Sequence, residues 1–587
     1  MRSLVTLAFL HVVLVLCAAP LSAETRTAPL ATIVLDSRNA DVIPRHGIIE
    51  LALAHNGIYR DPYSDVTVEA TFRAPSGTYR EVRGFYYGRD VWKVRFRPRE
   101  VGHWTYSYVI TSADGGFRQQ GTGAFDCEPS EAEGPVRRHP ENPFRWIIEE
   151  NATAGRRLYF PLGLQDCIPA PGPSRPMRVD GSESRRNESR PLSYADYFAL
   201  YRDAGFNLFR FSQRNCSYSL FDDLDRYREA EILATDDLLA TARAQGFRVM
   251  FGFFGFYNRW VEGAGGAQPL TRLLRPLLGL RRDPLVEASD VEQFDKQQRF
   301  VAYAVARWGV HADFWELLNE REASDAWTTL MAEHVRSVDP ERKPVTTSWE
   351  KPDLPAIDIN APHWYESESE RESDLRVEQQ AASWKAAGKP VIVGEQGNKG
   401  MNWDPLSATR LRIRSWTGLF EEVSFILWNT SWSKRGMFGG HHRQGRVANI
   451  YLGPEERTYT RALQAFAARL DVDVRMVPVQ VSAPNDVRAY GLVSATVAAA
   501  YLHHFADHSQ PLQGLTVTLA PPTRAAGGQL FAQWTDPATG QEVGRSTIPS
   551  STTRLEVPPF RVDLALLLTT NRPISSHSEL QPRASSR

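Results

Sequence analysis

The chain has 587 residues, which at about 150 residues per domain suggests three or four domains. Hydrophobic residues make up 42% of the sequence and charged residues 23%, so a folded core is expected and global disorder is excluded. The 68 Lys and Arg residues nearly balance the 69 Asp and Glu residues, which argues against a nucleic-acid-binding protein, because such a protein concentrates positive charge.

The N-terminal segment has the features of a secretory signal. Arg2 is followed by an apolar run at residues 4–16 and then by small residues that end at Ala23. The run is too short to span a bilayer, and this pattern is typical of a cleaved signal peptide. We therefore expect a signal peptide at residues 1–23 and a secreted or periplasmic mature chain with no membrane span. A lipoprotein signal at Cys17 is less favoured, because Leu16 is not a small residue.

The next region has the pattern of antiparallel strands. Apolar and polar residues alternate at 66–72, 92–97 and 104–110, with turn sequences at 74–77 and 114–116. Alternation with period two indicates strands with one buried face and one solvated face. We expect an N-terminal β-sandwich at residues 30–128, followed by a polar linker.

From about residue 140 the pattern changes to alternating strands and helices. Segments of helical period separate eight short apolar runs, which lie at residues 158–164, 206–211, 248–254, 313–318, 344–347, 357–363, 390–394 and 423–428. Eight strands that alternate with helices predict a (β/α)8 TIM barrel, here over residues 140–470. The alternative is a doubly wound open sheet, but the sequence lacks the Gly-rich phosphate turn that usually follows an early strand of that fold.

Alternation returns near the C-terminus, and it predicts a small β-sandwich at residues 476–570 followed by a disordered tail at 571–587. Three cysteines remain after the signal peptide, and an odd number cannot form a closed disulfide framework. A disulfide between Cys167 and Cys216, which follow the first two predicted strands, is a hypothesis. No Cys/His cluster has the spacing of a structural zinc site.

Two glutamates follow strands of the predicted barrel. Asn319 and Glu320 come directly after the fourth apolar run, and Glu395 comes after the seventh. Active sites of such barrels lie at the carboxyl ends of the strands, so the two carboxylates are expected to face each other. One carboxyl that donates a proton and another that attacks the anomeric carbon cleave a glycosidic bond, with retention at a separation of about 5–5.5 Å and inversion at about 6.5–9.5 Å. The alternative is two surface ion pairs.

The runs at residues 317–320 and 393–395 resemble those of the clan A glycoside hydrolases, the cellulase-like superfamily of retaining (β/α)8 enzymes. The order of β-sandwich, barrel and C-terminal β domain is similar to bacterial proteins with an apiosidase-like catalytic domain and a collagen-binding-like module. This resemblance implies a secreted retaining glycosidase that acts on a polysaccharide or oligosaccharide and needs no cofactor or metal. It further implies that Glu320 is the acid/base, that Glu395 is the nucleophile and that Asn319 binds the 2-hydroxyl of the sugar.

Three further residues are candidates for supporting the nucleophile or the substrate. Arg210 ends the second predicted strand, and the resemblance implies an Arg that keeps Glu395 ionised; the alternative is a charge that faces solvent. His363 and Tyr365 follow the sixth strand, where Tyr365 would hydrogen-bond the nucleophile and His363 a sugar hydroxyl. Ordinary loop packing is the alternative for both residues.

Three more candidates lie after the first and eighth predicted strands. Trp428 is expected to form a platform under the sugar, with core packing as the alternative. Gln165 and Asp166 are expected to bind hydroxyls of the innermost sugar, with loop capping as the alternative. Many clan A relatives have a histidine after the third strand, whereas this chain has aromatic residues at 251–257, so the sequence does not specify the sugar.

Other functions are less consistent with the sequence. The histidine pairs at 441–442 and 503–504 are expected to be solvated rather than metal-binding, because no carboxylate partner has suitable spacing. The chain has no GxSxG or HExxH motif, which disfavours a serine or zinc hydrolase. A carbohydrate-binding scaffold of the same fold without activity remains the alternative, and the sequence gives no indication of the oligomeric state.

Overall fold

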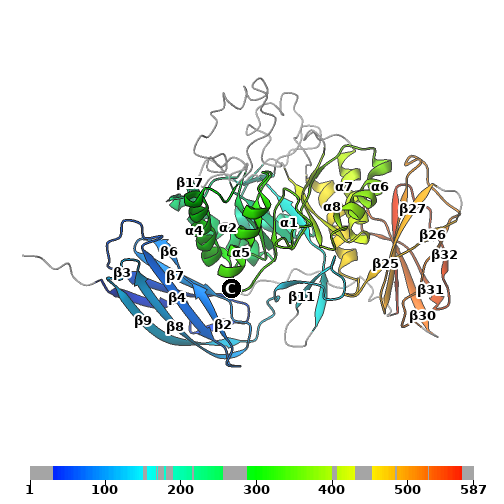
Figure 1. Cartoon of the computed structure of the whole chain (residues 1–587). Helices are drawn as coiled ribbons and strands as arrows, with labels where there is room; N and C mark the ends of the chain where they lie inside the picture. The colour runs from blue at the N-terminus through cyan, green and yellow to red at the C-terminus, as the bar shows by residue number, and fades with distance from the viewer. Residues whose placement is uncertain are drawn as a thin grey trace, which may run out of the picture.

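The computed structural model describes residues 31–149, 155–166, 168, 177–179, 190–213, 217–255, 287–398, 406–429, 452–482, 486–525 and 528–570. The predicted signal peptide, the C-terminal tail, Cys167, Cys216 and the histidine pair at 441–442 lie outside these residues. A mixed α/β region lies between β-rich regions at the two ends of the chain (Figure 1). Within the described ranges, no helix has the length and apolar character needed to cross a membrane.

The N-terminal strands form two sheets around one buried cluster. The four-stranded sheet has the order β1 (Ile33–Arg38), β3 (Ile49–His55), β7 (Val91–Phe96) and β6 (Phe85–Gly88). The five-stranded sheet has the order β2 (Val42–Pro44), β9 (Arg118–Glu128), β8 (Gly102–Ser112), β4 (Val66–Arg73) and β5 (Tyr79–Arg83). Buried and exposed residues alternate along β4 and β8, and apolar residues of both sheets share the cluster.

The central region contains an eight-stranded parallel sheet. Its strands are β13 (Leu162–Gln165), β16 (Leu208–Ser212), β19 (Arg248–Phe254), β20 (Phe314–Leu318), β21 (Val345–Thr346), β22 (His363–Tyr365), β23 (Val391–Gly397) and β24 (Val423–Trp428). The order β21-β20-β19-β16-β13-β24-β23-β22 places the last strand beside the first, so the sheet is curled as the predicted alternation requires. Backbone hydrogen bonds from Asp358 to Val345 and from Asn360 to Pro390 link the segment between β21 and β22 to β21 and to the residue before β23.

Two strand predictions differ from the structure. The first apolar run is divided between β12 (Arg156–Tyr159) and β13, because Pro161 lies between them and has no backbone N–H to donate. The sixth apolar run, at residues 357–363, mostly precedes β22, which begins at His363. Strand β12 belongs to a three-stranded antiparallel sheet with β10 (Val136–Arg138) and β11 (Trp146–Glu149). Apolar side chains of this small sheet pack against the amino ends of the parallel strands, where the ring of Trp146 lies 5.1 Å from that of Phe314.

Helices cover the outer face of the curled sheet. They are α1 (Tyr194–Arg202), α2 (Glu229–Ala244), α4 (Val291–Trp308), α5 (Asp325–Val338), η2 (Glu370–Glu372), α6 (Ser373–Trp384), α7 (Ser407–Phe420) and α8 (Pro454–Ala467). The side chains of Ser193, Asp290 and Ser324 cap α1, α4 and α5 by accepting a backbone N–H of the first turn. Short antiparallel pairs, β14 (Met177–Val179) with β15 (Arg190–Leu192) and β17 (Phe221–Asp223) with β18 (Arg226–Tyr227), lie in the connections.

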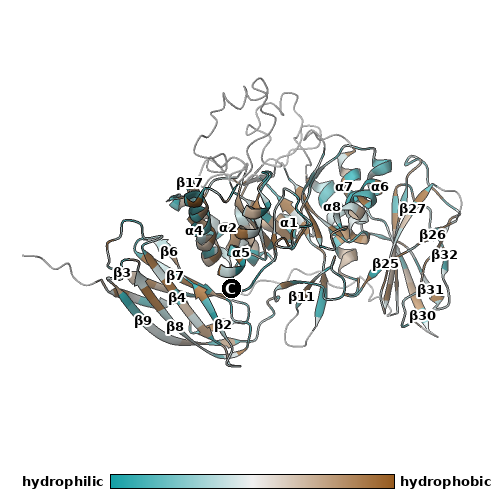
Figure 2. Cartoon of the chain, in the orientation of Figure 1, coloured by the Kyte–Doolittle hydropathy of each residue, from teal (hydrophilic) through white to brown (hydrophobic). Residues whose placement is uncertain are grey.

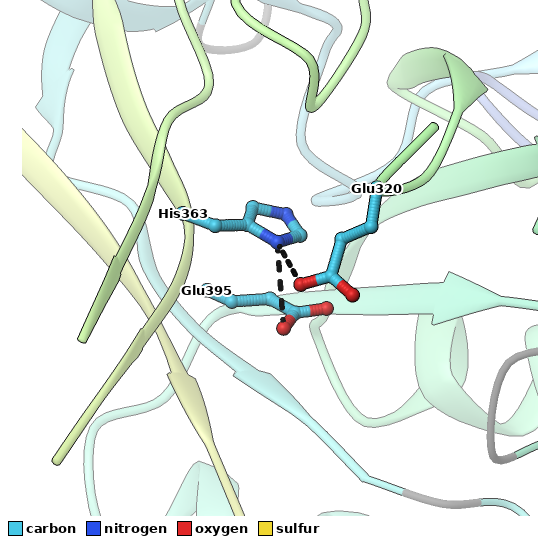
Figure 3. A group of neighbouring side chains, drawn as sticks. All are labelled: Glu320, His363 and Glu395. Carbon is cyan, nitrogen blue, oxygen red and sulfur yellow. Dashed lines mark hydrogen bonds and ion pairs between the residues drawn. The ribbon is translucent and has the colours of Figure 1, made fainter. Parts of the chain in front are cut away.

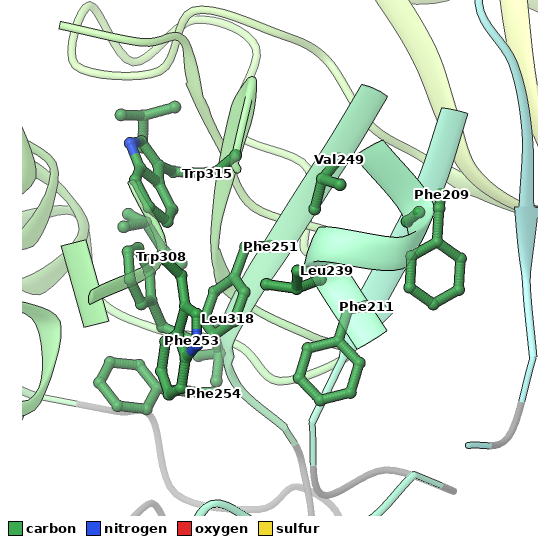
Figure 4. Close-up of a cluster of buried hydrophobic side chains, with 14 of the residues drawn as sticks. Phe209, Phe211, Leu239, Val249, Phe251, Phe253, Phe254, Trp308, Trp315 and Leu318 are labelled. Atoms are coloured by element: carbon green, nitrogen blue, oxygen red, sulfur yellow. The ribbon is translucent and has the colours of Figure 1, made fainter. Parts of the chain in front are cut away.

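Aromatic side chains fill the space between the curled sheet and its helices. Phe251 stacks on Trp308 with ring centroids 5.2 Å apart, and Phe253 stacks on Trp315 at 5.0 Å (Figure 4). Apolar residues dominate the central strands, whereas polar residues gather on the outer faces of the helices (Figure 2). Because side chains alternate along a strand, the residues between these aromatic positions point into the interior of the curled sheet.

The C-terminal region contains a six-stranded and a three-stranded sheet. The larger sheet has the order β25 (Arg475–Val477), β27 (Val487–Val493), β28 (Val497–His504), β33 (Asp563–Thr569), β30 (Gln529–Thr535) and β31 (Glu542–Pro549). The smaller sheet consists of β26 (Gln480–Val481), β29 (Thr516–Thr518) and β32 (Arg554–Glu556). One face of the larger sheet packs on α7 and α8, and the other shares a cluster with the smaller sheet.

The expectation that His503 and His504 are solvated is wrong. Both residues end β28, which is buried along its whole length because it lies in the middle of the larger sheet with both faces covered. The Nδ1 atom of His503 lies 2.8 Å from a carboxylate oxygen of Asp374 on α6. The carboxylate partner thus comes from a distant part of the chain, which local spacing does not reveal.

Candidate active site

Alternation along the parallel strands divides the interior of the curled sheet into an apolar layer and a charged layer. Leu208, Met250 and Phe314 belong to a buried apolar cluster near the amino ends of their strands. Two residues further along the same strands lie Arg210, Gly252 and Glu316. A Cβ atom at Gly252 would lie 3.0 Å from an oxygen of Glu316, so the glycine leaves room for that carboxylate.

Arg210 is the centre of the charged layer. Its side chain is 0% exposed, so the alternative of a solvent-facing charge does not apply. Its Nε and Nη2 atoms donate to the two oxygens of Glu316 at 2.9 and 2.6 Å, and its Nη1 donates to Oε1 of Glu395 at 2.8 Å. Arg210 also donates to Gln165 and to Asn319. Burial opposes the charge, but the Glu316 and Glu395 carboxylates raise the pKa of Arg210, which remains a cation.

A bulge in β23 positions Glu395. The strand continues to Gly397 rather than ending at Glu395, and its pairing with β24 shifts register between Val393 and Gln396. A β-bulge adds one residue to one strand and re-aims the side chains beside it. Glu395 is 1% exposed and accepts hydrogen bonds from Arg210.

Two further donors bind the Glu395 carboxylate. The Tyr365 hydroxyl donates to Oε2, and Gln165 Nε2 donates to Oε1 at 3.2 Å. Burial and the charges of Glu395 and Glu320 raise the pKa of Tyr365 well above its ordinary value, so Tyr365 stays a donor. Gln165 therefore contacts the carboxylate and Arg210 within the charged layer.

Glu320 has an unusual backbone conformation. It directly follows Asn319 at the end of β20 and has φ of 48°, in the left-handed region that few non-glycine residues adopt. Its backbone N–H donates to the Ser348 hydroxyl at 2.7 Å, and the same hydroxyl lies 3.2 Å from the Leu318 carbonyl oxygen. The side chain of Glu320 is 39% exposed, in contrast to the buried Glu395.

His363 lies between the two glutamates (Figure 3). Its Nδ1 atom is 2.9 Å from Oε1 of Glu320 and 3.5 Å from Oε2 of Glu395. One ligand atom from each of the three residues lies within 4.8 Å of the other two, so the two carboxylates meet as the sequence predicts. This group of three is also the one set of described His, Cys, Asp and Glu side chains with the geometry to hold a metal ion.

The two carboxyl groups have opposite pKa shifts. Burial raises the pKa of Glu395, and the Glu320 charge adds to this effect, while His363, Arg210 and Tyr365 oppose it. Burial also favours neutral Glu320, but the hydrogen bond from His363 and the charges of His363 and Arg210 outweigh it and lower the pKa of Glu320. A general acid in a glycosidase ordinarily has a raised pKa, and the resemblance implies an Arg210 that keeps Glu395 ionised, so both shifts are opposite to those expected.

Three further predicted residues are buried in different surroundings. Asn319 is buried, and its Oδ1 accepts a hydrogen bond from Arg210 at 2.5 Å. Asp166 is buried and accepts from the Tyr197 hydroxyl at 2.8 Å and from Asn429 at 3.1 Å, which ties the end of β13 to α1. Trp428 is 7% exposed, and its Nε1 is buried without a hydrogen-bond partner in the described structure.

Two residues of this site were absent from the sequence prediction. Glu316 binds Arg210 with both oxygens, and an acidic residue inside an otherwise apolar strand was the available signal for it. Ser348 follows β21 and binds the Glu320 backbone, and no local pattern marks it. The predicted residues Glu320, Glu395, Arg210, Asn319, His363, Tyr365 and Gln165 lie in one connected network with these two.

Comparisons with known proteins give the following results. A domain of unknown function, DUF5060, matches residues 43–111. No curated protein matches the chain by sequence. Among solved structures, a "putative glycoside hydrolase" from Bacteroides vulgatus ATCC 8482 aligns with a TM-score of 0.56 and 16% identity over 90% of this chain and 100% of that chain.

Two further solved structures align less closely. An Anoxybacillus alpha-amylase covers 70% of this chain and 99% of its own, with 12% identity and a TM-score of 0.45. A GH30 endoxylanase from Clostridium papyrosolvens C71 covers 71% of this chain and 98% of its own, with 10% identity and a TM-score of 0.42. The chain therefore shares its fold with the Bacteroides protein, which is described as a putative glycoside hydrolase.

Proposed function

We propose that the chain is a glycoside hydrolase that cleaves O-glycosidic bonds of a polysaccharide or oligosaccharide by a retaining double displacement. The observation that carries the proposal is the meeting of Glu320 and Glu395, with carboxylate oxygens within 4.8 Å at the carboxyl ends of β20 and β23. Retaining enzymes hold their carboxyl groups about 5–5.5 Å apart, whereas inverting enzymes leave about 6.5–9.5 Å for a water molecule.

Glu395 has the environment of a nucleophile. Donors from Arg210, Tyr365 and Gln165 hold its two oxygens in a fixed orientation. Such preorganisation places an oxygen for attack on the anomeric carbon without further rearrangement. Burial raises the pKa of Glu395, so the attacking carboxylate forms at a higher pH than an ordinary glutamate requires.

Glu320 acts as acid and base together with His363. Because Oε1 of Glu320 and Nδ1 of His363 are 2.9 Å apart, the pair can hold one proton between them. In the first step Glu320 gives this proton to the leaving oxygen while Glu395 bonds to the sugar. In the second step Glu320 removes a proton from water, which attacks the anomeric carbon and releases Glu395.

The proposal extends to the family and to the fate of the chain. We place the chain with clan A and the apiosidase-like proteins, with a signal peptide at residues 1–23 that directs secretion. The proposed domains are β-sandwiches at residues 30–128 and 476–570 around a (β/α)8 barrel at 140–470. Asn319, Gln165 and Asp166 are assigned to binding hydroxyls of the sugar, and Trp428 to forming a platform under it. The alignment of the Bacteroides structure with 90% of this chain, at a TM-score of 0.56, supports this organisation.

The proposal is tested on a panel of glycans and aryl glycosides. Glu320→Gln and Glu395→Gln should each lower kcat by about 1,000-fold or more, since each removes a covalent or proton-transfer step. Glu333→Gln, on the exposed face of α5, is the matched control and should leave kcat unchanged. Azide should restore turnover of an activated aryl glycoside by Glu320→Ala, because this anion replaces the water that the missing base would activate. Near-normal turnover by either Gln variant would refute the assignment.

The lowered pKa of Glu320 favours one alternative, a carbohydrate-binding scaffold without activity. In that case the protein would bind glycans tightly and release no product during long incubation. The carboxylate mechanism also predicts that dialysis against EDTA leaves activity intact, although Glu320, His363 and Glu395 have the geometry to hold a metal. Loss of activity on dialysis, restored by a divalent ion, would replace the proposed mechanism with a metal-dependent one.

A further inference from the structure

A cavity lies far from the two glutamates. The empty space within it is about 760 Å³, part of which is open to solvent, and it lies between N-terminal strands on one side and residues 309–313 and 338–343 on the other. Those two segments precede β20 and β21, whereas Glu320 follows β20. The cavity therefore opens at the amino ends of the parallel strands, opposite the proposed active site (Figure 1 shows the N-terminal strands beside α4 and α5).

Each carboxylate of the cavity wall forms an ion pair with a basic residue other than Arg97. Four acidic residues line it, and each already has a basic partner: Glu133 with Arg157 and Arg248, Asp313 with Arg243 and Arg248, Asp339 with Lys343, and Glu341 with Arg99. Arg95, which also lines the cavity, pairs with Glu50 and Asp236 outside it. No lining carboxylate is therefore left for Arg97.

The side chain of Arg97 has no hydrogen bond or ion pair with any described residue, and its Nε atom is buried. Burial together with the neighbouring charges of Arg243, Arg248 and Arg99 lowers the pKa of Arg97 to about 9, although the charge of Asp313 opposes this shift. A partly buried cation that lies near several other cations and forms no ion pair is costly unless an anion accompanies it. The same surroundings affect His46 on the cavity wall, where burial and nearby arginines lower the pKa to about 4.

We propose that this cavity binds a small oxyanion through the guanidinium of Arg97. A guanidinium presents parallel N–H donors that match the oxygens of a phosphate or a carboxylate. Apolar side chains of Val82, Val305 and Val338 form part of the wall, so the carbon skeleton of an acidic sugar fits beside the charged group. Inorganic phosphate and a uronic acid share the recognised chemistry, and the experiment separates them.

A ligand in this place would join the N-terminal strands to the central region. The cavity wall combines Arg97 of the N-terminal region with Asp313 and Lys343 of the central region. Binding there should raise the thermal stability of the full chain without direct contact with Glu320 or Glu395. Anything that binds the folded state alone stabilises it in proportion to the logarithm of its concentration above Kd.

The test is calorimetric titration of the full chain, in buffer free of phosphate and carboxylates, with inorganic phosphate, with glucuronate and with neutral glucose. At least one of the two anions should bind the unaltered protein and raise its Tm, while glucose at the same concentration should do neither at this site. Arg97→Gln should lower the affinity for that anion at least tenfold. Arg118→Gln, on the exposed part of β9, is the matched control and should bind as the unaltered protein does.

Stability without ligand separates this proposal from a structural role of Arg97. If Arg97 awaits an anion, Arg97→Gln should have an equal or higher Tm in anion-free buffer, because an unpaired cation has been removed. A lower Tm for the variant in that buffer, equal anion affinity in the variant and the unaltered protein, or no binding of either anion would overturn the proposal. Glycosidase activity is measured separately and enters neither result.

Discussion

Replacement of Ser348 by alanine tests how the chain holds Glu320 in place. The Ser348 hydroxyl is the acceptor for the Glu320 backbone N–H at 2.7 Å, and Glu320 has a left-handed φ of 48°. A non-glycine residue in such a conformation costs about 1–3 kcal/mol and persists only when its surroundings enforce it. In Ser348→Ala the N–H loses its acceptor, which costs about 1–3 kcal/mol when no water replaces it.

The cost of the left-handed conformation is similar to the cost of the lost hydrogen bond. In the variant, the Glu320 backbone is therefore no longer held in its left-handed conformation and can relax. Relaxation would move the Glu320 carboxylate away from His363, whose Nδ1 is now 2.9 Å from it. A misplacement of about 1 Å at a catalytic group costs about 100-fold in rate. We therefore expect Ser348→Ala to lower kcat by about 10- to 100-fold on a cleaved glycan, with little change in KM.

The neighbouring residue supplies the control. The Thr347 hydroxyl donates to the Leu318 carbonyl oxygen at 3.2 Å and does not contact the Glu320 backbone. Thr347→Val should therefore lower the free energy of unfolding by a similar amount and leave kcat nearly unchanged. If Ser348→Ala retains full kcat, or if both variants lose kcat equally, the hydrogen bond to Glu320 does not position the carboxylate.

Three other predictions follow from buried charges. His363→Ala should raise the pKa of Glu320, because the hydrogen bond that favours its ionised form is lost, and the alkaline limb of the kcat/KM profile should move to higher pH. Glu316→Gln leaves Arg210 with one carboxylate instead of two. We expect this change to lower the free energy of unfolding, measured by urea denaturation, by about 3 kcal/mol. Burial raises the pKa of Asp374, but hydrogen bonds and charges from the buried His503 and the partly exposed Arg488 outweigh burial and lower that pKa to about 2. Asp374→Asn should therefore lower the free energy of unfolding by about 2 kcal/mol at pH 7, and this difference should fade as the pH drops from 4 to 2.

The strands and the proposed catalytic pair were predictable because they depend on local pattern. Eight apolar runs with helices between them require a parallel sheet, and residues that follow such strands gather at one end of it. Glu320, Glu395 and Arg210 were found by this reasoning, since each lies at or near the end of an apolar run.

Features that depend on tertiary partners were not predictable in this way. The bulge before Gln396 comes from the pairing of β23 with β24, and no residue type marks it. Which of the two glutamates has the lowered pKa depends on which one His363 contacts, and 43 residues separate His363 from Glu320 along the chain. His503 was expected in solvent because its partner Asp374 lies in a different region of the sequence.

The most direct test of the account is mass spectrometry of a trapped intermediate. The protein is incubated with a 2-deoxy-2-fluoro aryl glycoside of the sugar that it cleaves, digested and mapped for a covalent sugar adduct. We expect one adduct, on the carboxylate of Glu395, and none in Glu395→Gln. Turnover of the parent glycan together with no adduct, or an adduct on Glu320, would contradict the proposed double displacement.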